Sequence, residues 1–393
     1  YEDKISLLDK IQKIAKEIGF DVITTAHIFP IPKFILRSET AILECYLSPV
    51  IQSYSKRIKK KHSSVPLYFM QSSGGLVRSD LFNGSDSLLS GPAGGVIGAI
   101  KAAEACGIKK IIGFDMGGTS TDVFHFAGEL ERKNEHVISE KKISSPMLDI
   151  YTLASGGGSI LNYNDFRFQV GPQSAGSNPG PCCYDNGGPL TVTDANLLLG
   201  RILPSSFAQN FGKNKNSPLN SSKTKTQFKS FKSKMNTAKS IYKIAEGFIT
   251  IANQKMALGL EKISKQRGID LKSYTLVSYG GAGGQLACEL ADHIGIRKIL
   301  IHPLASVLSA CGIGKAQIRN IQKKHLSIKV LNNWKDKIEK IYFEIENEAK
   351  KALISQGVHP SEIILQRKIT LKYEDTFSLL SFHYSPEKNF EKI

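Results

Sequence analysis

The sequence predicts an α/β protein, and two observations lead to this prediction. Segments with the apolar spacing of an amphipathic helix alternate along the chain with short apolar and β-branched runs that are typical of buried strands. Such alternation is characteristic of a sheet whose faces are covered by helices. The length of 393 residues is sufficient for two or three domains, or for one large body of two lobes.

The first third of the chain is predicted to begin with helices and to continue into strands. Its opening helix has apolar residues at helical spacing and ends at Gly19, and the next helix ends in a basic run that suits the negative pole of its dipole. The elements predicted here are a helix over 4–19, a strand over 20–26, a helix over 38–61 interrupted by Pro49, a strand over 65–70, a turn over 71–75, a helix over 95–106, and strands over 109–114 and 122–126.

The rest of the chain alternates in the same way after a region rich in glycine and proline. Residues 154–188 combine these two residue types in so varied an order that they are predicted to form a set of constrained loops. The elements predicted beyond them are a helix over 240–267 ending at Gly268, a strand over 274–278, a glycine loop over 280–284, a helix over 285–294, a strand over 299–302, a helix over 335–356, and strands over 363–373 and 377–383.

The net charge of +17 comes mainly from two segments. Residues 195–245 contain Arg201 and nine lysines but no acidic residue, and residues 56–61 add five more basic side chains. Around 211–238 the sequence is polar, low in complexity and poor in aromatic residues, so we predict a disordered insertion that is dispensable for folding. A nucleic-acid surface is expected to combine basic residues with stacking aromatics, so nucleic acid is not an expected partner.

Several other classes of protein and site are not expected. No run of about 18 apolar residues is present, which argues against a membrane-spanning helix. The six cysteines form no CxxC pair and the nine histidines no HExxH pattern, which argues against a disulfide framework and a zinc site. We therefore expect a protein of a reducing compartment, the cytoplasm. The lack of an initiator Met before Tyr1 predicts an internal portion of a longer chain.

The first motif with clear chemistry is a glycine hairpin between two predicted strands, Asp-Met-Gly-Gly-Thr-Ser-Thr-Asp at 115–122. We predict that Asp115 binds Mg²⁺ or its water shell, and that Asp122 holds the loop or polarises a water molecule. Glycines present backbone amides without a blocking Cβ, and hydroxyls add donors, so the loop is predicted to cradle phosphate. The predicted phosphate-binding residues are Gly117, Gly118, Thr119, Ser120 and Thr121.

A second glycine loop, at 280–284, follows a predicted strand and precedes a helix. Bare backbone at a helix N-terminus suits a nucleotide base or a phosphate, although a plain turn between strand and helix has equal weight. The residues predicted to bind the nucleotide are Gly280, Gly281, Ala282 and Gly283. Glycine clusters at 72–75, 90–95 and 154–159 are individually turns, but the five loops together predict the walls of a nucleotide cleft.

Two further features leave alternatives open. Asp194 follows an apolar run at the head of a helix, so a helix cap and a catalytic acid have equal weight. Cys182 and Cys183 lie among prolines, where a packed or merely accessible thiol is favoured over a nucleophile.

Six motifs occur in a fixed order along most of the chain. They are Ser-Gly-Pro-Ala-Gly-Gly at 90–95, Gly-Phe-Asp-Met-Gly-Gly-Thr-Ser-Thr-Asp-Val at 113–123, Gly-Gly-Gly-Ser at 156–159, Val-Gly-Pro-Gln-Ser-Ala-Gly-Ser-Asn-Pro-Gly-Pro-Cys-Cys-Tyr at 170–184, Thr-Val-Thr-Asp-Ala-Asn-Leu at 191–197 and Gly-Gly-Ala-Gly-Gly-Gln at 280–285. This order resembles the hydantoinase/oxoprolinase family, in its ATPase (hydantoinase A-like) half. Leu-Tyr-Phe-Met-Gln-Ser-Ser-Gly-Gly-Leu at 67–76 makes the chain most similar to the ATP-dependent 5-oxoprolinases.

The resemblance implies lobes similar to those of actin, sugar kinases and Hsp70, incomplete at the N-terminus, with a phosphate loop at 115–121 and an adenosine loop at 280–284. Family members open with an earlier Asp-x-Gly-Gly-Thr-x-Thr-Asp loop, and this chain has only one copy of that motif. The implied domains are the end of an N-terminal lobe region over 1–108, the ATPase domain over 109–320 and the start of a C-terminal α/β domain over 321–393.

The resemblance also implies an ATP- and Mg²⁺-dependent hydrolase that opens a cyclic amide, 5-oxo-L-proline giving L-glutamate. The alternatives are a hydantoinase acting on another cyclic amide or imide, and an inert nucleotide-binding subunit. Asp115, Asp122 and Asp194 are the implied catalytic residues, with residues 171–184 on the substrate side. The implied partners are the missing N-terminal lobe and a hydantoinase B-like half, in an oligomer.

Overall fold

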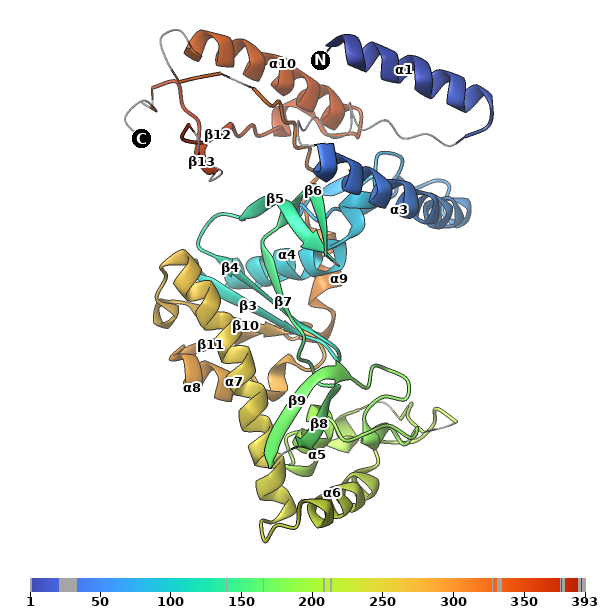
Figure 1. Ribbon diagram of the computed structural model, residues 1–393, viewed down its shortest axis with the longest axis vertical. Helices are drawn as coiled ribbons and strands as arrows, with labels where there is room; N and C mark the ends of the chain where they lie inside the picture. Colours follow the sequence, from blue (N-terminus) through green and yellow to red (C-terminus); the bar gives the residue numbers. More distant parts are fainter. Residues whose placement is uncertain are drawn as a thin grey trace.

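The computed structural model describes residues 2–20, 34–138, 140–164, 166–207, 209–212, 214–326, 328–330, 334–374, 376, 379–387 and 390. The molecule is elongated, with a central sheet between an upper region that includes both ends of the chain and a lower subdomain (Figure 1). Since strands and helices are both present throughout, the predicted mixed α/β class is confirmed.

A five-stranded sheet forms the centre of the molecule, in the order β11-β10-β3-β4-β7. Its strands are β3 (Ile111–Met116), β4 (Thr121–Phe126), β7 (Ile150–Leu153), β10 (Thr275–Tyr279) and β11 (Lys298–Ile301). β3, β10 and β11 are parallel, so the carboxyl ends of β3 and β10 lie at the same edge of the sheet. β4 runs antiparallel to both β3 and β7.

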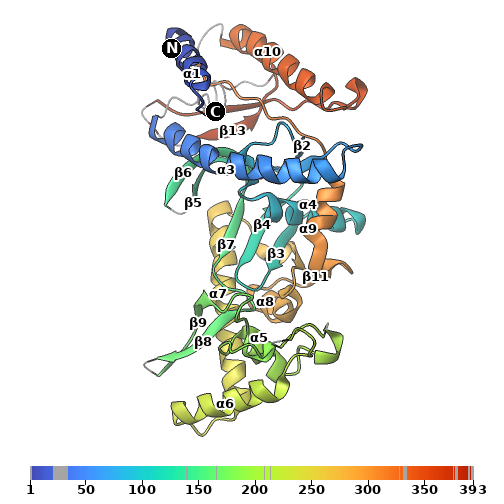
Figure 2. The same cartoon turned by 90° about the vertical axis from the view of Figure 1, so that its right-hand side faces the viewer.

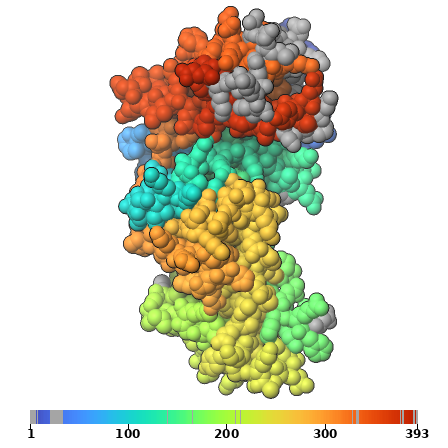
Figure 3. Space-filling model, turned by 90° about the vertical axis from the view of Figure 1, so that its left-hand side faces the viewer, coloured from blue at the N-terminus to red at the C-terminus, as the bar shows by residue number. Residues whose placement is uncertain are grey.

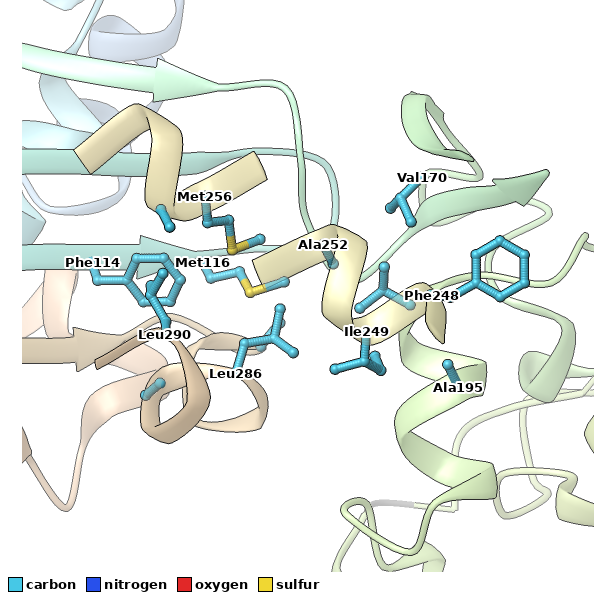
Figure 4. Close-up of a cluster of buried hydrophobic side chains, with 14 of the residues drawn as sticks. Phe114, Met116, Val170, Ala195, Phe248, Ile249, Ala252, Met256, Leu286 and Leu290 are labelled. Atoms are coloured by element: carbon cyan, nitrogen blue, oxygen red, sulfur yellow. The ribbon is translucent and has the colours of Figure 1, made fainter. Parts of the chain in front are cut away.

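Helices cover both faces of this sheet. Ile112 and Phe114 of β3 are buried against α7 (Ile241–Arg267) and α8 (Ala287–Ile294), and Figure 4 shows Phe114 beside Leu290. Ile111 points to the other face, where it packs with α4 (Ser90–Ala105) and α9 (Leu308–Lys315). Neighbouring residues of β3 therefore serve two separate cores, as expected for a strand buried on both sides.

The glycine cluster at 90–95, predicted to be a loop, instead forms the first turns of α4. A Cβ on Gly98 would overlap the backbone of Leu308, and one on Gly312 would overlap the carbonyl oxygen of Gly94. Gly94, Gly98 and Gly312 therefore serve the close approach of α4 and α9, whereas Gly95 lies against the ring of Tyr279 at the end of β10.

A lower subdomain is inserted between β7 and α7. It contains β8 (Ser159–Asn164), β9 (Arg167–Ser174), α5 (Val192–Leu198) and α6 (Ser221–Met235). Figure 3 shows α7, in yellow, running over the surface from the level of the central sheet down to this subdomain. Ser240 caps the N-terminus of α7 and Gly268, with φ 61°, ends it, which confirms the helix predicted over 240–267.

The prediction of disorder over 211–238 is wrong for α6. Thr224, Phe228 and Met235 share one face of this helix and are buried, and Phe228 packs in the same core as α7. Asn220 accepts a hydrogen bond from the amide of Lys223 and so caps the helix. The lysines occupy the other faces of α6. Although its composition is biased, the helix is therefore amphipathic, and its apolar face packs into the core.

The upper region combines long helices and short strands from the two ends of the chain with a hairpin over 132–148. Its elements are α1 (Glu2–Glu17), α3 (Phe34–Lys61), β1 (Tyr68–Met70), β2 (Leu76–Arg78), β5 (Arg132–Ile138), β6 (Lys141–Leu148), α10 (Trp334–Ile354), β12 (Lys368–Leu371) and β13 (Leu380–His383). Pro49 lies inside α3 without interrupting it, contrary to the prediction. The strand predicted over 20–26 falls almost entirely on residues outside the described ranges.

Short 3₁₀ helices complete the structure: η1 (Gly84–Ser87), η2 (Cys182–Tyr184), η3 (Pro204–Ser206), η4 (Leu271–Ser273), η5 (Gly283–Gln285), η6 (Ala305–Val307) and η7 (Pro360–Glu362). Within the described ranges, no helix combines the length and the apolar character that crossing a bilayer requires.

Candidate active site

The hairpin between β3 and β4 places two carboxylates opposite each other. Asp115, near the end of β3, is the cross-strand partner of Asp122 on β4. Burial, together with the charge of Asp122, raises the pKa of Asp115 to about 6. Burial also raises the pKa of Asp122, and the hydroxyl of Thr152 on β7 donates a hydrogen bond of 2.6 Å to it. The pair is thus a site of concentrated negative charge that a cation would stabilise.

The tip of this hairpin presents only part of the predicted phosphate cradle. The amide of Gly117 donates to the carbonyl oxygen of Ser120 at 3.0 Å, and the hydroxyl of Thr121 donates to the carbonyl oxygen of Ser155 at 2.6 Å. These two predicted donors are therefore used within the protein. Gly118 and Thr119 are exposed at the tip, and their amides have no backbone acceptor among the described residues. The geometry leaves Gly118, Thr119 and Ser120 as the candidate ligand donors.

The glycine cluster at 154–159 is hydrogen-bonded to the backbone of this hairpin. The amides of Gly157 and Gly158 donate to the carbonyl oxygens of Gly117 and Gly118, at 3.0 and 2.6 Å. A Cβ on Gly156 would lie 2.7 Å from the carbonyl oxygen of Gly118, so this close approach needs glycine. The cluster predicted at 154–159 therefore supports the cradle and holds the carbonyl groups of the hairpin away from a ligand.

The loop at 280–284 lies beside the carboxylate of Asp115. Gly280 has φ 82°, and a Cβ there would overlap the Asp115 carboxylate and lie 2.5 Å from the carbonyl oxygen of Met116. The amide of Ala282 donates to this same carbonyl group at 2.9 Å. Gly281 and Gly284 are exposed and have open space around them. The structure thus brings the two predicted glycine loops together at the carboxyl edge of β3 and β10.

Three of the five predicted glycine clusters meet at this edge as loops, and the other two have a different structure. The cluster at 72–75 forms the hairpin between β1 and β2, where Gly74 packs against Leu148 and Gly75 against Arg319. The cluster at 90–95 begins α4, and a Cβ on Gly95 would lie 2.8 Å from the ring of Tyr279 at the end of β10. The contribution of residues 72–75 and 90–95 to the walls of a nucleotide cleft stays a prediction.

Asp194 has a structural environment that favours the capping alternative. It is fully buried in the first turn of α5 and forms a capping box with Thr191. Its carboxylate also accepts hydrogen bonds from the amides of Cys182 and Cys183, at 3.0 and 2.7 Å, and from the hydroxyl of Thr224 at 3.3 Å. With both oxygens occupied by these donors, Asp194 joins α5, α6 and the proline-rich loop.

The two neighbouring cysteines are packed thiols, which was the favoured alternative. Both are buried, and burial, reinforced by the charge of Asp194, raises the pKa of Cys182 to about 11 and that of Cys183 further. Such thiols are protonated at neutral pH and are poor nucleophiles.

Two residues with roles at this site had escaped prediction. Thr152, on strand β7, donates a hydrogen bond to Asp122. The sequence pattern does not predict this strand. Thr193, at the start of α5, donates from both its amide and its hydroxyl to the carbonyl oxygen of Gly157, at 2.8 and 2.9 Å. The two threonines that precede Asp194, Thr191 and Thr193, were the visible signal for the second residue, but the acceptor of Thr193 lies 36 positions away.

Comparisons with known proteins show what the chain is similar to. The chain is 40% identical to the 5-oxoprolinase PfmaA of Pestalotiopsis fici over 94% of its length, and 39% identical to the 5-oxoprolinase of Saccharomyces cerevisiae over 97%. It spans only 29% and 31% of those two proteins. The crystal structure of an ATP-dependent caprolactamase from Pseudomonas jessenii superimposes with a TM-score of 0.79 at 28% identity, covering 96% of this chain and 56% of that one.

The model of one protein family, described as hydantoinase/oxoprolinase, matches residues 37–322. This range contains the central sheet, the lower subdomain and all three loops of the candidate site. The chain therefore belongs to the hydantoinase/oxoprolinase family.

Proposed function

We propose that this chain is the ATP-handling part of an enzyme that opens a cyclic amide, 5-oxo-L-proline giving L-glutamate, with hydrolysis of ATP. The observation that carries the proposal is the meeting of the Asp115–Asp122 pair, the exposed amides of Gly118 and Thr119, and the bare loop at 280–284. The similarity to two 5-oxoprolinases over nearly the whole chain supports this substrate.

The residues of the site fit a magnesium–nucleotide complex. Asp115 would hold Mg²⁺ or one of its water ligands, because its burial and the charge of Asp122 make a nearby cation favourable. Gly118 and Thr119 would donate to phosphate oxygens, and Gly281 and Gly284 leave room for the adenosine. When bound, Mg²⁺ neutralises charge that develops on the transferring phosphoryl group.

The chemistry requires a phosphate site because an unstrained amide is a poor electrophile. The lactam oxygen attacks the γ-phosphorus of ATP, which releases ADP and turns that oxygen into part of a leaving group. One water molecule adds to the lactam carbon, and cleavage of the C–N bond leaves γ-glutamyl phosphate. A second water molecule hydrolyses this acyl phosphate to L-glutamate and inorganic phosphate. In this scheme the hairpin orients and stabilises the transferring phosphoryl group, which is most of what phosphoryl transfer demands of a protein.

We further propose the architecture that the resemblance implies. The central sheet with its helices would be one lobe of an actin-like pair, and the earlier phosphate loop would come from a second lobe. A hydantoinase B-like half would complete an oligomeric, cytoplasmic enzyme. The boundaries at 108 and 320 remain predictions, and so does the absence of nucleic acid among the partners.

A second candidate substrate is a different lactam. It is favoured by the match to the caprolactamase structure, which covers 96% of this chain. The alternative that is not an enzyme is an inert nucleotide-binding subunit. Measuring turnover of ATP and lactam distinguishes this subunit from a 5-oxoprolinase and from an enzyme that acts on another lactam.

The proposal is tested in two steps. Isothermal titration of Mg·ATP should show affinity at least about 10-fold lower for Asp115→Asn than for the wild type, since contacts to a charged group contribute about 1.5–3 kcal/mol. Asp292→Asn, on the exposed side of α8, is the control and should bind normally. Phosphate release by the complete assembly should then depend on 5-oxoproline and not on caprolactam. Equal affinity of all three proteins would refute the site, and dependence on caprolactam would refute the substrate.

A further inference from the structure

Two arginines lie on the tight turn that joins β1 to β2. The Nε atom of Arg132, on β5, donates a hydrogen bond of 2.7 Å to the carbonyl oxygen of Ser73. The stem of Arg319 packs against Gly75, where a Cβ would overlap the Arg319 side chain. Burial, together with the charge of Arg319, lowers the pKa of Arg132 to about 10. The two guanidinium groups are therefore like charges held close to each other.

Neither guanidinium group forms an ion pair with a carboxylate of the described residues. The Nη2 atom of Arg132 is buried and has no hydrogen-bond partner. Burial alone shifts the pKa of Arg319, downward, as expected for a cation without an acidic neighbour. The charge of Glu129 acts on Arg132, but the two oxygens of this carboxylate are already bound to Lys368 and His383. Because an unpaired charged donor is unfavourable inside a protein, the pair is suited to an oxyanion.

The backbone around the pair holds both side chains in place. The amide of Arg319 donates to the carbonyl oxygen of Leu76, on β2, at 3.0 Å. A third cation, Lys323, follows four positions later and donates to the side-chain oxygen of Asn134, on β5, rather than to a carboxylate. Arg132 and Arg319 are both partly exposed, so solvent reaches the pair. Paired guanidinium forks in such a setting bind carboxylates and phosphates through several hydrogen bonds at once.

This pair is separate from the candidate active site. Arg132 is the cross-strand partner of Leu148, which precedes the first residue of β7 by two positions. The phosphate hairpin lies at the opposite end of β7, where Thr121 pairs with Leu153, the last residue of that strand. Figure 2 shows β2, β5 and β6 above β7, in the upper part of the molecule. The two arginines therefore cannot serve the same anion as the hairpin at 115–122.

We propose that Arg132 and Arg319 form a second anion-binding site, and that it takes a free dianionic oxyanion, inorganic phosphate. Two guanidinium groups without carboxylate partners balance two negative charges, and their donors suit the oxygens of a tetrahedral anion. A simple carboxylate would balance only one of the two charges. The site goes beyond the function proposed above and does not depend on it.

Titration calorimetry of the 393-residue chain tests the site without nucleotide or Mg²⁺. At constant ionic strength, phosphate and sulfate should bind, and acetate should bind at least about 10-fold more weakly, because it has one charge instead of two. Arg319→Gln removes charge-assisted hydrogen bonds and should weaken phosphate binding at least about 10-fold. Arg297→Gln is the matched control, because Arg297 is exposed just before β11, and it should bind phosphate like the wild type.

Two further measurements separate the site from a structural role of Arg319. In phosphate-free buffer, Arg319→Gln should melt no lower than the wild type, because it removes repulsion from Arg132, and added phosphate should raise the melting temperature of the wild type alone. Modification by phenylglyoxal, followed by mass spectrometry, locates the site without a substitution. At a phosphate concentration about 10-fold above the dissociation constant, Arg319 should react about 10-fold more slowly by mass action, whereas Arg297 should react as before.

Three results overturn the proposal. The first is equal affinity of Arg319→Gln and the wild type for phosphate, or no binding by either, because the anion would then bind elsewhere or not at all. The second is acetate that binds as tightly as phosphate, which would refute the assignment of a dianion. The third is a lower melting temperature of Arg319→Gln in phosphate-free buffer, which would mean that Arg319 already has a stabilising partner within the chain.

Discussion

Asp115 illustrates how a residue predicted from a pattern acquires properties from its neighbours. An apolar strand, the carboxylate near its end, two glycines and three hydroxyl residues together predict a phosphate hairpin, whereas the carboxylate and glycines alone would not. The roles of Gly117 and Thr121 were not predictable in the same way, because the acceptors of their hydrogen bonds are set by tertiary packing. The same reason hid Thr152, whose strand β7 becomes visible only through its pairing with β4.

The raised pKa of Asp115 predicts a dependence of stability on pH. Its pKa in the folded protein, about 6, lies above the ordinary value of 3.8, so the folded state binds more protons between these values. The contribution of this group to stability is therefore lost as pH rises through that window, by at most about 3 kcal/mol. In magnesium-free buffer, Asp115→Asn should melt at a higher temperature than the wild type at pH 7 and at nearly the same temperature at pH 4. Scanning calorimetry that gives the same difference at both pH values would contradict this assignment.

Gly280 and Gly281 form a matched pair for testing the loop beside Asp115. An alanine at 280 would occupy a left-handed backbone conformation and overlap the Asp115 carboxylate, whereas one at 281 meets open space. Gly280→Ala should lower the free energy of unfolding by about 1–3 kcal/mol and weaken Mg·ATP binding. Gly281→Ala should change the free energy of unfolding little. Urea unfolding and titration calorimetry measure both effects, and equal behaviour of the two variants would count against the geometry.

At the scale of elements, local sequence signals predicted the long helices. They missed the strands and the helix that depend on contacts with distant parts of the chain. The ends of α7 were predictable because Ser240 and Gly268 are local caps. The strands β5, β6, β8 and β9 form two-stranded sheets outside the central one, and their runs mix polar and apolar residues too irregularly to be recognised. Helix α6 was missed because composition was weighed above period, although its three buried residues recur at helical spacing.

Helix α6 therefore has a testable role in stability. Phe228→Ala should lower the free energy of unfolding by about 3–5 kcal/mol, because it empties a fully buried aromatic site. Lys229→Ala, the exposed neighbour, should change it by less than about 0.5 kcal/mol. Denaturant unfolding of both variants measures the difference. A mild effect of Phe228→Ala would support the prediction that the residues around 211–238 are dispensable for folding.

At the scale of the whole molecule, the sequence contains one copy of the predicted phosphate hairpin. Phosphoryl transfer depends on positioning the γ-phosphate from more than one side, and the hairpin at 115–122 approaches from one side only. We therefore expect this chain alone to turn over little ATP. Adding the second lobe and the hydantoinase B-like half should restore ATP hydrolysis that depends on 5-oxoproline. Robust, substrate-dependent turnover by the 393-residue chain in a coupled ATPase assay would show that another segment supplies the missing donors.

The hydrogen bonds that join the hairpin to α5 allow ligand binding at the hairpin to be measured at residues that do not contact the ligand. Thr193 binds the carbonyl group of Gly157, whose amide binds Gly117, so the tip of the hairpin is tied to α5. Asp194 on α5 in turn restrains the amides of Cys182 and Cys183. A ligand that reduces the motion of the hairpin should therefore slow deuterium uptake at these two buried amides, although it does not contact them. Hydrogen–deuterium exchange measured by mass spectrometry, with and without Mg·ATP, would then report nucleotide binding through the proline-rich loop. Unchanged uptake in this loop would mean that the hairpin and α5 move independently.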